Sequence, residues 1–208
     1  MCDTHGGPDP GYTSTNILAV DLEPELRVWN YFGDNLKVMG QLAEQCTESI
    51  LAAAKLMTET FKAGGKVLLC GNGGSAADCQ HMATELVPHG LPAIALTTDS
   101  SLLTAIANDD SFDQIFVKQV QALGKRGDLL IAISTSGHSG NVLNAAGFAR
   151  YKDLRTIALT GQDTRLSREV DVAICAPSDN TQHIQEAHLA IEHILCELAT
   201  RAMADDNK

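Results

Sequence analysis

Short apolar segments alternate with longer amphipathic segments along most of the chain. The apolar segments are predicted strands, at 66–70, 93–97, 128–133, 155–159 and 170–175. Helical stretches separate them, at about 75–87, 112–124, 139–151 and 181–203. Short apolar strands rich in β-branched residues are typical of a parallel sheet that is buried on both faces. The alternation therefore predicts a doubly wound α/β fold, with a five-stranded parallel sheet between two layers of helices.

A long amphipathic stretch precedes the first predicted strand. Between residues 23 and 62 apolar residues recur at steps of three and four, which is the period of a helix with one buried face. Gly64 and Gly65 end this helix. Residues 1–20 are rich in Gly, Pro, Thr and Asp and indicate a flexible tail. We therefore expect a tail over 1–20 and one domain over 21–208 that includes an N-terminal helical segment.

Two loops of small residues follow predicted strands and open predicted helices. The first loop is 71–75 (Gly-Asn-Gly-Gly-Ser) and the second loop is 134–139 (Ser-Thr-Ser-Gly-His-Ser). Backbone N–H groups and hydroxyls at such turns converge on anions, where the helix dipole favours negative charge. The first loop alone could equally be a tight turn. The second carries four hydroxyls where a helix cap needs one, and the two together predict a pocket for a phosphorylated small molecule.

Two nucleotide motifs are incomplete in the first loop. Ala76 stands where a Gly-x-Gly-x-x-Gly fingerprint has its third glycine, and no Gly-Lys-Ser/Thr of a P-loop is present. The formal net charge of −11 argues against nucleic-acid binding through a basic surface. None of the six cysteines forms a Cys-x-x-Cys pair, and no apolar run reaches the length of a membrane span. These features favour a reduced, cytoplasmic protein with neither nucleic acid nor membrane as a partner.

Candidate acid/base residues lie on two predicted helices. His81 and Glu85 are four residues apart, so they share one face of the helix that follows the first loop. The last helix carries a second polar group, namely Gln185, Glu186, His188, Glu192 and His193. A solvated His–Glu pair and a satisfied core histidine are the structural alternatives. Two helices that each carry a histidine, both near phosphate-type loops, favour proton transfer or metal binding.

Together these motifs resemble one family. The segments that carry the resemblance are 71–78, His81 and Glu85, the second loop, and 184–186 with His188 and His193. They resemble the phosphoheptose isomerases, which are sugar-isomerase (SIS) domain enzymes, from about residue 36 to residue 203. The resemblance implies conversion of sedoheptulose 7-phosphate to D-glycero-D-manno-heptose 7-phosphate, the first step toward ADP-heptose for lipopolysaccharide. It also implies a homotetramer with active sites shared between subunits.

The resemblance assigns roles to individual positions. It implies that Glu85 and His193 are the acid/base pair. It implies that phosphate and sugar are held by Asn72, Gly73, Ser75, Asn108, Asp109, Ser134, Thr135, Ser136, Ser139 and Gln185. It also implies one zinc per subunit on His81, Glu85, Gln185 and His193. Helix geometry alone would choose Glu186 rather than Gln185, since Glu186 lies seven residues from His193 and nearly in line with it. An amide is also an unusual zinc ligand.

One segment departs from the family pattern, and two other functions compete with the isomerase. The connection 86–92 is about half a dozen residues shorter than the same connection in the family. In the family this connection carries a basic residue that reaches the substrate, and no such residue is found here. Either the loop is short or a mobile segment is missing from the sequence. A related SIS protein that binds the bacterial replication initiator is similar through 104–109, but its positions matching Glu85 and His193 are not acid/base residues. The third candidate is a sugar-phosphate-sensing SIS module, for which no DNA-binding region is present.

Overall fold

The computed structural model describes residues 23–205. The chain divides into two compact units, residues 1–36 and 37–208, and helix α1 (Pro24–Lys62) contributes to both. In the first unit, Trp29, Phe32 and Leu36 are 75%, 61% and 71% exposed. Their spacing places these three apolar side chains on one side of the helix. The tail predicted over 1–20 lies outside the described residues.

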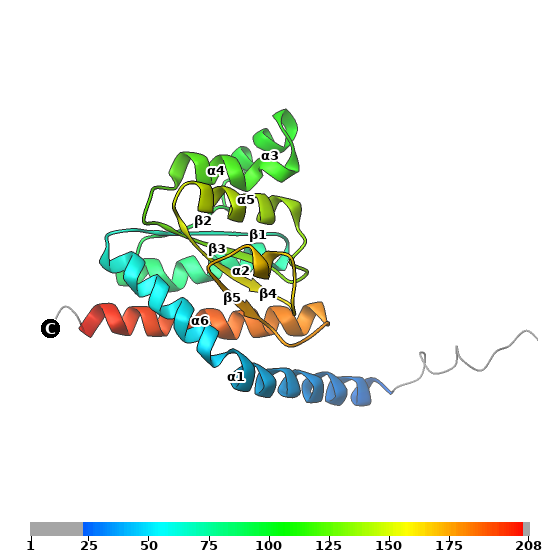
Figure 1. The fold of residues 1–208 in the computed structure, drawn as a ribbon. Helices are drawn as coiled ribbons and strands as arrows, with labels where there is room; N and C mark the ends of the chain where they lie inside the picture. The colour runs from blue at the N-terminus through cyan, green and yellow to red at the C-terminus, as the bar shows by residue number, and fades with distance from the viewer. Residues whose placement is uncertain (1–22, 206–208) are drawn as a thin grey trace, which may run out of the picture. The chain divides into compact units, whose positions relative to one another are not determined.

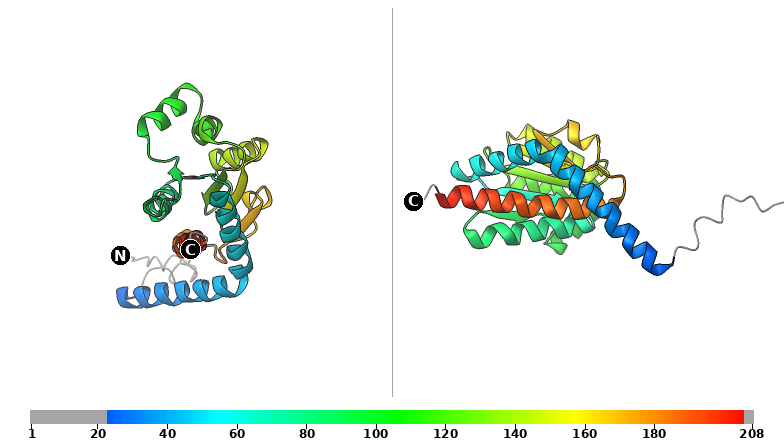
Figure 2. Two further views of the ribbon diagram at one scale, coloured as in Figure 1. Left: turned by 90° about the vertical axis from the view of Figure 1, so that its left-hand side faces the viewer. Right: turned by 90° about the horizontal axis from the view of Figure 1, so that it is seen from below.

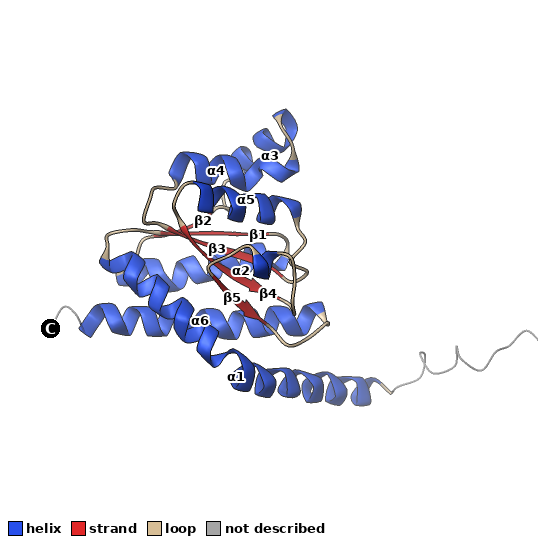
Figure 3. Ribbon diagram, viewed as in Figure 1, coloured by secondary structure: helices blue, strands red, loops and turns tan. Residues whose placement is uncertain are grey.

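Five parallel strands form the sheet of the second unit (Figure 1). The strands are β1 (Val67–Gly71), β2 (Ala93–Ala95), β3 (Leu129–Ser134), β4 (Arg155–Thr160) and β5 (Val172–Cys175), in the spatial order β2-β1-β3-β4-β5. Every neighbouring pair is parallel, so the predicted sheet is confirmed. Strand β2 is two residues shorter than expected, because the chain turns at Leu96 and Thr97. Figure 3 shows the sheet as the middle layer of this unit.

Alternate residues of the central strands enter two separate hydrophobic cores. Leu69 and Ile131 belong to one core, which they share with α2 (Gly74–Leu86), α6 (Thr181–Asp205) and the part of α1 after residue 37. Leu68 and Leu130 belong to the other, with α4 (Ile115–Leu123) and α5 (Gly140–Tyr151). Side chains in a strand point alternately to opposite faces, so each face of the sheet carries its own helical layer (Figure 2). The three-layer arrangement predicted from the sequence is confirmed.

One helix between β1 and α4 differs from the sequence-based expectation, and the short connection after α2 forms a turn. Helix α3 (Ser100–Asp109) was not predicted; it begins at Asp99, whose side chain accepts a hydrogen bond from the Leu102 N–H at 2.9 Å. The connection 86–92 forms a single 3₁₀ turn, η2 (Val87–His89), closed by Gly90 at φ 75°. Two further 3₁₀ turns are present: η3 (Phe112–Gln114) precedes α4, and η4 (Leu166–Arg168) precedes β5.

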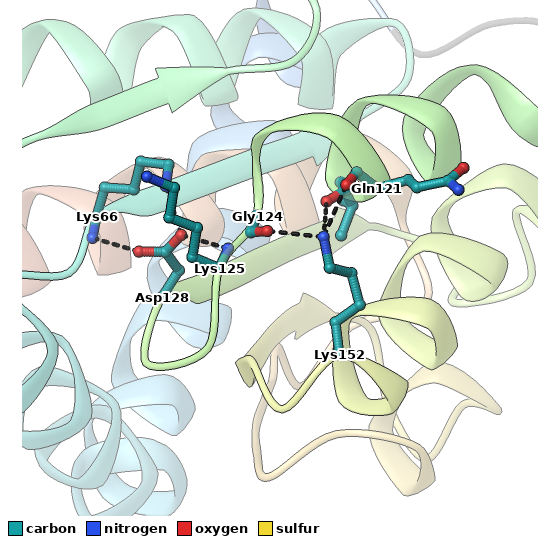
Figure 4. Close-up of polar contacts among 7 residues, drawn as sticks. Lys66, Gln121, Gly124, Lys125, Asp128 and Lys152 are labelled. Carbon is teal, nitrogen blue, oxygen red and sulfur yellow. Dashed lines mark hydrogen bonds and ion pairs between the residues drawn. The ribbon is translucent and has the colours of Figure 1, made fainter.

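Polar contacts hold together the segments at the amino ends of the strands, which is the end of the sheet opposite the two loops (Figure 4). The Asp128 carboxylate accepts hydrogen bonds from the Lys66 ammonium at 2.5 Å and from the Lys125 N–H at 2.8 Å. The Lys152 ammonium donates to the carbonyls of Gln121 and Gly124, both at 2.7 Å. A cation suits the last carbonyls of α4, where the helix dipole is negative. Among the described residues, no helix is both long and apolar enough to cross a membrane.

Candidate functional site

The first loop turns tightly between β1 and α2. A Cβ on Gly71 would lie 2.7 Å from the Ser75 carbonyl oxygen, and Gly73 has φ 58°, so only glycine suits either position. Gly73 precedes the first residue of α2 without a side-chain cap. The first N–H groups of a helix have no partner within the helix. The loop therefore leaves backbone donors at the start of α2, beside the buried Ser75.

Two hydroxyls of the second loop, those of Ser134 and Ser139, face each other. Ser134 Oγ accepts a hydrogen bond from the Gly137 N–H at 3.1 Å and lies 3.1 Å from Ser139 Oγ. Ser139 stands at the N-cap position of α5, yet its side chain makes no capping bond. Gly137 has φ 61°, and a Cβ there would overlap Thr164. The hydroxyls of Ser134 and Ser139 thus form contacts within the loop and do not cap α5. Such a cluster of hydroxyls and N–H groups is expected of a phosphate site.

An amide pair joins the two loops. Asn72 Nδ2 donates to Asn141 Oδ1 at 2.8 Å, and Asn141 Nδ2 donates back to Asn72 Oδ1 at the same distance. The two residues are 69 positions apart, and the Asn141 side chain is buried. Asn141 was not among the predicted site residues. Its sequence signal is an amide inside the first turn of a helix whose neighbours, Val142 and Ala145, are apolar and buried.

Helix α6 runs parallel to α2 and lies against it. Near its start, Gln185 packs on the first loop so closely that a Cβ on Gly74 would overlap its side-chain amide. Glu186, the alternative that helix geometry favoured, lies with Oε2 3.2 Å from His183 Nδ1. Farther along, Cys196 Sγ lies 4.0 Å from the Met82 carbonyl oxygen. The structure therefore places Gln185, rather than Glu186, beside the first loop.

Two histidines meet across this helix pair. His81 Nε2 and His193 Nε2 are 2.8 Å apart, and the rings are nearly perpendicular at 78°. One turn beyond His81, the side chain of Glu85 lies exposed on α2. Glu85 and His193 line one hollow of about 300 Å³, whose other lining residues are His89, Cys196, Glu197, Thr200 and Arg201. The structure thus brings together the two residues predicted as the acid/base pair, and His81 with them.

The same helix pair carries two carboxyl groups with buried oxygens, one on α2 and one on α6. Asp78 Oδ2 and both oxygens of Glu192 are buried with no hydrogen-bond partner among the described residues. Burial raises the pKa of Glu192 to about 8, and the Asp78 carboxyl adds to the shift. Burial also raises the pKa of Asp78 to about 6, partly offset by His81. Near neutral pH, the structure favours a protonated Glu192.

His188 belongs to the core rather than to the site. It is fully buried, and its Nε2 lies 3.2 Å from the Thr160 carbonyl oxygen. Burial lowers the pKa of His188 to about 4, and the hydrogen bond to Thr160 offsets part of that shift. A neutral imidazole that donates to a backbone carbonyl is a structural group, which was the alternative left open for this helix.

Asn108 and Asp109 make no hydrogen bond to either loop among the described residues. Both are exposed at the end of α3, and Asn108 Nδ2 donates to Asp109 Oδ1 at 2.8 Å. None of the hydrogen bonds found for residues 23–205 joins either one to the first or second loop. Their predicted contact with sugar hydroxyls therefore stays a prediction.

The four predicted zinc ligands are only partly assembled. The two imidazole nitrogens converge, which suits a shared cation, and Glu85 lies one turn from His81. Gln185 lies at the first loop, two turns before His193 on α6. Within residues 23–205, no three side chains of His, Cys, Asp or Glu cluster closely enough to hold a metal ion. Three of the four residues, the two histidines and the glutamate, are of the kinds that zinc prefers, and the two imidazole nitrogens already face each other.

Comparison with known proteins places this arrangement in a family. The SIS domain model matches residues 30–161, so the chain is a SIS-domain protein. A phosphoheptose isomerase from Roseiflexus sp. (strain RS-1) is 46% identical over 179 residues, covering 83% of this chain and 91% of that protein. The structure of a phosphoheptose isomerase from Neisseria gonorrhoeae matches with a TM-score of 0.84 at 42% identity, covering 85% of this chain and 98% of that one. The Francisella tularensis structure has the same TM-score at 39% identity, covering 86% and 100%. The chain belongs to the phosphoheptose isomerase family.

Proposed function

We propose that the protein is an isomerase that converts sedoheptulose 7-phosphate to D-glycero-D-manno-heptose 7-phosphate. The reaction would supply the heptose that becomes ADP-heptose in lipopolysaccharide biosynthesis. The observation that carries this proposal is the hollow lined by both Glu85 and His193, on helices whose first turns adjoin the first loop. The relatives named phosphoheptose isomerase support the same reaction.

The two loops would hold the phosphate. Backbone N–H groups at the start of α2, with Ser75, would face the same anion as the hydroxyls of Ser134, Ser136 and Ser139. The phosphate sits at the far end of the sugar from the reacting carbons, so its binding energy orients the substrate. Along α2, His81 lies about 9 Å beyond Ser75 at 1.5 Å per residue, which is comparable with the length of an extended heptose.

The acid/base pair would move two protons through an enediol-type intermediate. Glu85 takes a proton from C1 of the ketose, while His193 donates one to the carbonyl oxygen at C2. His193 then accepts the proton of the C1 hydroxyl, and Glu85 returns its proton to C2. The products are an aldehyde at C1 and a hydroxyl at C2, and both side chains regain their starting states.

A zinc ion is proposed as the cofactor, one per subunit. His81, Glu85, Gln185 and His193 would hold it, and when bound it would supply Lewis-acid stabilisation of negative charge on the sugar oxygens. The close approach of His81 Nε2 to His193 Nε2 supports this assignment. Imidazole nitrogens are common metal ligands, and these two already face each other.

A cytoplasmic homotetramer with active sites shared between subunits is also proposed. Glu85 and His193 are exposed on the outer side of the α2–α6 pair, yet an enediol must be shielded from water. Two exposed apolar residues, Val87 of η2 at 53% and Ile194 of α6 at 40%, suit a covering surface. A second copy of the chain would supply it, and Trp29, Phe32 and Leu36 offer further apolar surface for assembly.

The function is tested by incubating the purified protein with sedoheptulose 7-phosphate and following the aldose phosphate that forms. Turnover, with or without added zinc, is the expected result. Its absence under both conditions would overturn the isomerase function and favour the non-catalytic SIS protein that binds the replication initiator. Sedimentation of the same sample tests the tetramer, and a monomer that turns over substrate would overturn the shared sites.

A further inference from the structure

The amide pair between Asn72 and Asn141 has a defined direction. Asn141 Oδ1 accepts a second hydrogen bond, at 3.0 Å, from the N–H of Val142 in the first turn of α5. A backbone N–H can only donate. The atom facing it is therefore the oxygen of Asn141, and this in turn fixes the donor and acceptor sides of Asn72. The backbone of α5 thus sets the orientation of a side chain in the first loop.

The pair leaves Asn72 able to bind a ligand. A side-chain amide carries two N–H donors, and the pair uses one of them on Asn72. The second N–H points in a direction that the Asn141 contact determines, because a two-bond amide pair is planar and resists rotation. Asn72 lies between β1 and α2, where the backbone donors of Gly73 and Gly74 begin. A phosphate bound there could accept a hydrogen bond from the second N–H of the Asn72 amide, whose direction the Asn141 contact has fixed.

The pair also ties together two segments that have no chain connection nearby. Asn141 follows the second loop by two residues, and Asn72 is inside the first. Asn141 is only 2% exposed, so its amide is costly to leave unpaired. Loss of Asn141 would free the first loop to shift relative to Ser134 and Ser139.

We propose that Asn141 is a positioning residue, which orients Asn72 and holds the first loop in register with the second so that both face one phosphate monoester. This inference rests on the proposed function, since it assumes that a sugar phosphate binds at the two loops. Asn141 itself need not touch the substrate. Its effect passes through Asn72, so the two side chains must act as one unit in binding.

A double-mutant cycle tests this unit. Asn141→Leu has a similar volume and makes no hydrogen bond. We expect it to raise KM for sedoheptulose 7-phosphate about tenfold in the wild-type background, with a smaller change in kcat. In the Asn72→Ala background the same substitution should change KM less than about twofold, because the partner is already gone. Asn144→Leu, an exposed asparagine on the same helix, is the matched control and should leave KM unchanged.

Other results would overturn the positioning role. An equal effect of Asn141→Leu in both backgrounds means that Asn141 acts independently of Asn72, and no effect in either means that the pair is irrelevant to binding. If Asn141→Leu does not fold, Asn141→Ala replaces it in the cycle, because alanine also makes no side-chain hydrogen bond to Asn72.

The proposed function is separated from the inference by running binding beside turnover. If calorimetry shows that the wild type binds sedoheptulose 7-phosphate but the protein does not isomerise it, the proposed function is wrong. The double-mutant cycle is then repeated with the dissociation constant in place of KM, and it decides the role of Asn141. If the wild type binds no sugar phosphate, both are overturned. Wild-type turnover with additive effects overturns the inference alone.

Discussion

His81 Nε2 and His193 Nε2 lie 2.8 Å apart although 112 residues separate them in the chain. The contact exists because α2 and α6 run parallel, so each turn of one helix meets the corresponding turn of the other. Two nitrogens bound to one tetrahedral zinc would be about 3.3 Å apart, given zinc–nitrogen bonds of about 2.0–2.1 Å. The two Nε2 atoms would therefore have to move apart by only about 0.5 Å, through small side-chain rotations, to bind one zinc ion.

Zinc should stabilise the metal-free protein through these histidines. We expect added zinc to raise the melting temperature, because a ligand that binds only the folded state stabilises it. The shift should be lost in His81→Asn and in His193→Asn, as measured by differential scanning fluorimetry. His138→Asn, which alters a histidine of the second loop, is the control and should keep the shift. A full shift in the His81→Asn, His193→Asn double variant would rule out this site.

The acid/base pair makes the strongest prediction for activity. Glu85→Gln and His193→Asn should each lower kcat by at least about 100-fold, the usual size of a lost general acid or base. Both side chains are exposed on the chain, so neither change should alter its folding. Glu197→Gln changes a carboxylate that lines the same hollow and should retain most activity. Retention of most activity by Glu85→Gln or His193→Asn would show that the roles are misassigned.

Two glycines of the loops should respond differently to alanine. At Gly74, a Cβ would overlap only the flexible end of Gln185, so we expect lower activity with little change in the melting temperature. At Gly137, a Cβ would overlap the buried Thr164, and the backbone is in the left-handed region. Gly137→Ala should lower the melting temperature by more than about 5 °C. Similar melting temperatures for both variants would contradict this account of the loops.

Glu192 should make the protein less stable as pH rises. Its pKa is about 8 in the fold and 4.5 ordinarily, so between these values the folded state holds a proton that the unfolded chain has lost. The free energy of unfolding then falls with rising pH across that range. Glu192→Gln keeps the shape without the charge, and should melt about 5 °C above the wild type at pH 9 and equally at pH 5. Glu197→Gln, exposed on the same helix, should show no such divergence.

A constant gap between Glu192→Gln and the wild type at both pH values would mean that Glu192 does not titrate in the fold. Asp78 acts with the same sign at lower pH, since burial raises its pKa from 3.8 to about 6. Asp78→Asn in the Glu192→Gln background should therefore flatten the stability profile below pH 6. Melting curves at half-unit steps of pH distinguish the two carboxyl groups.

The sequence predicts the sheet and the two loops because both are local patterns. Apolar runs alternate with amphipathic stretches, and the glycines and serines follow the strands directly. Helix α3 was missed because its signal is one capping residue, Asp99, before a short helix with no fully buried side chain. A weak pattern of that kind gives little periodicity to detect.

The sequence predicts individual site residues but not the contacts between them. His81 and His193 could each be chosen as candidates, but their contact depends on how α2 and α6 pack, which no local pattern encodes. The same is true of Asn141, whose role appears only when its partner 69 residues away is known. Gln185 was chosen by resemblance, and its packing against Gly74 is a tertiary contact that helix periodicity does not predict.

The most direct measurement follows sedoheptulose 7-phosphate by NMR in deuterated water, with wild type and Glu85→Gln side by side and with and without zinc. The wild type should form the aldose phosphate with deuterium at C2, because the proton that Glu85 carries can exchange with solvent. Glu85→Gln should show less than about 1% of that rate. Absence of aldose phosphate from the wild type under both conditions, or equal rates for the two proteins, would contradict the account.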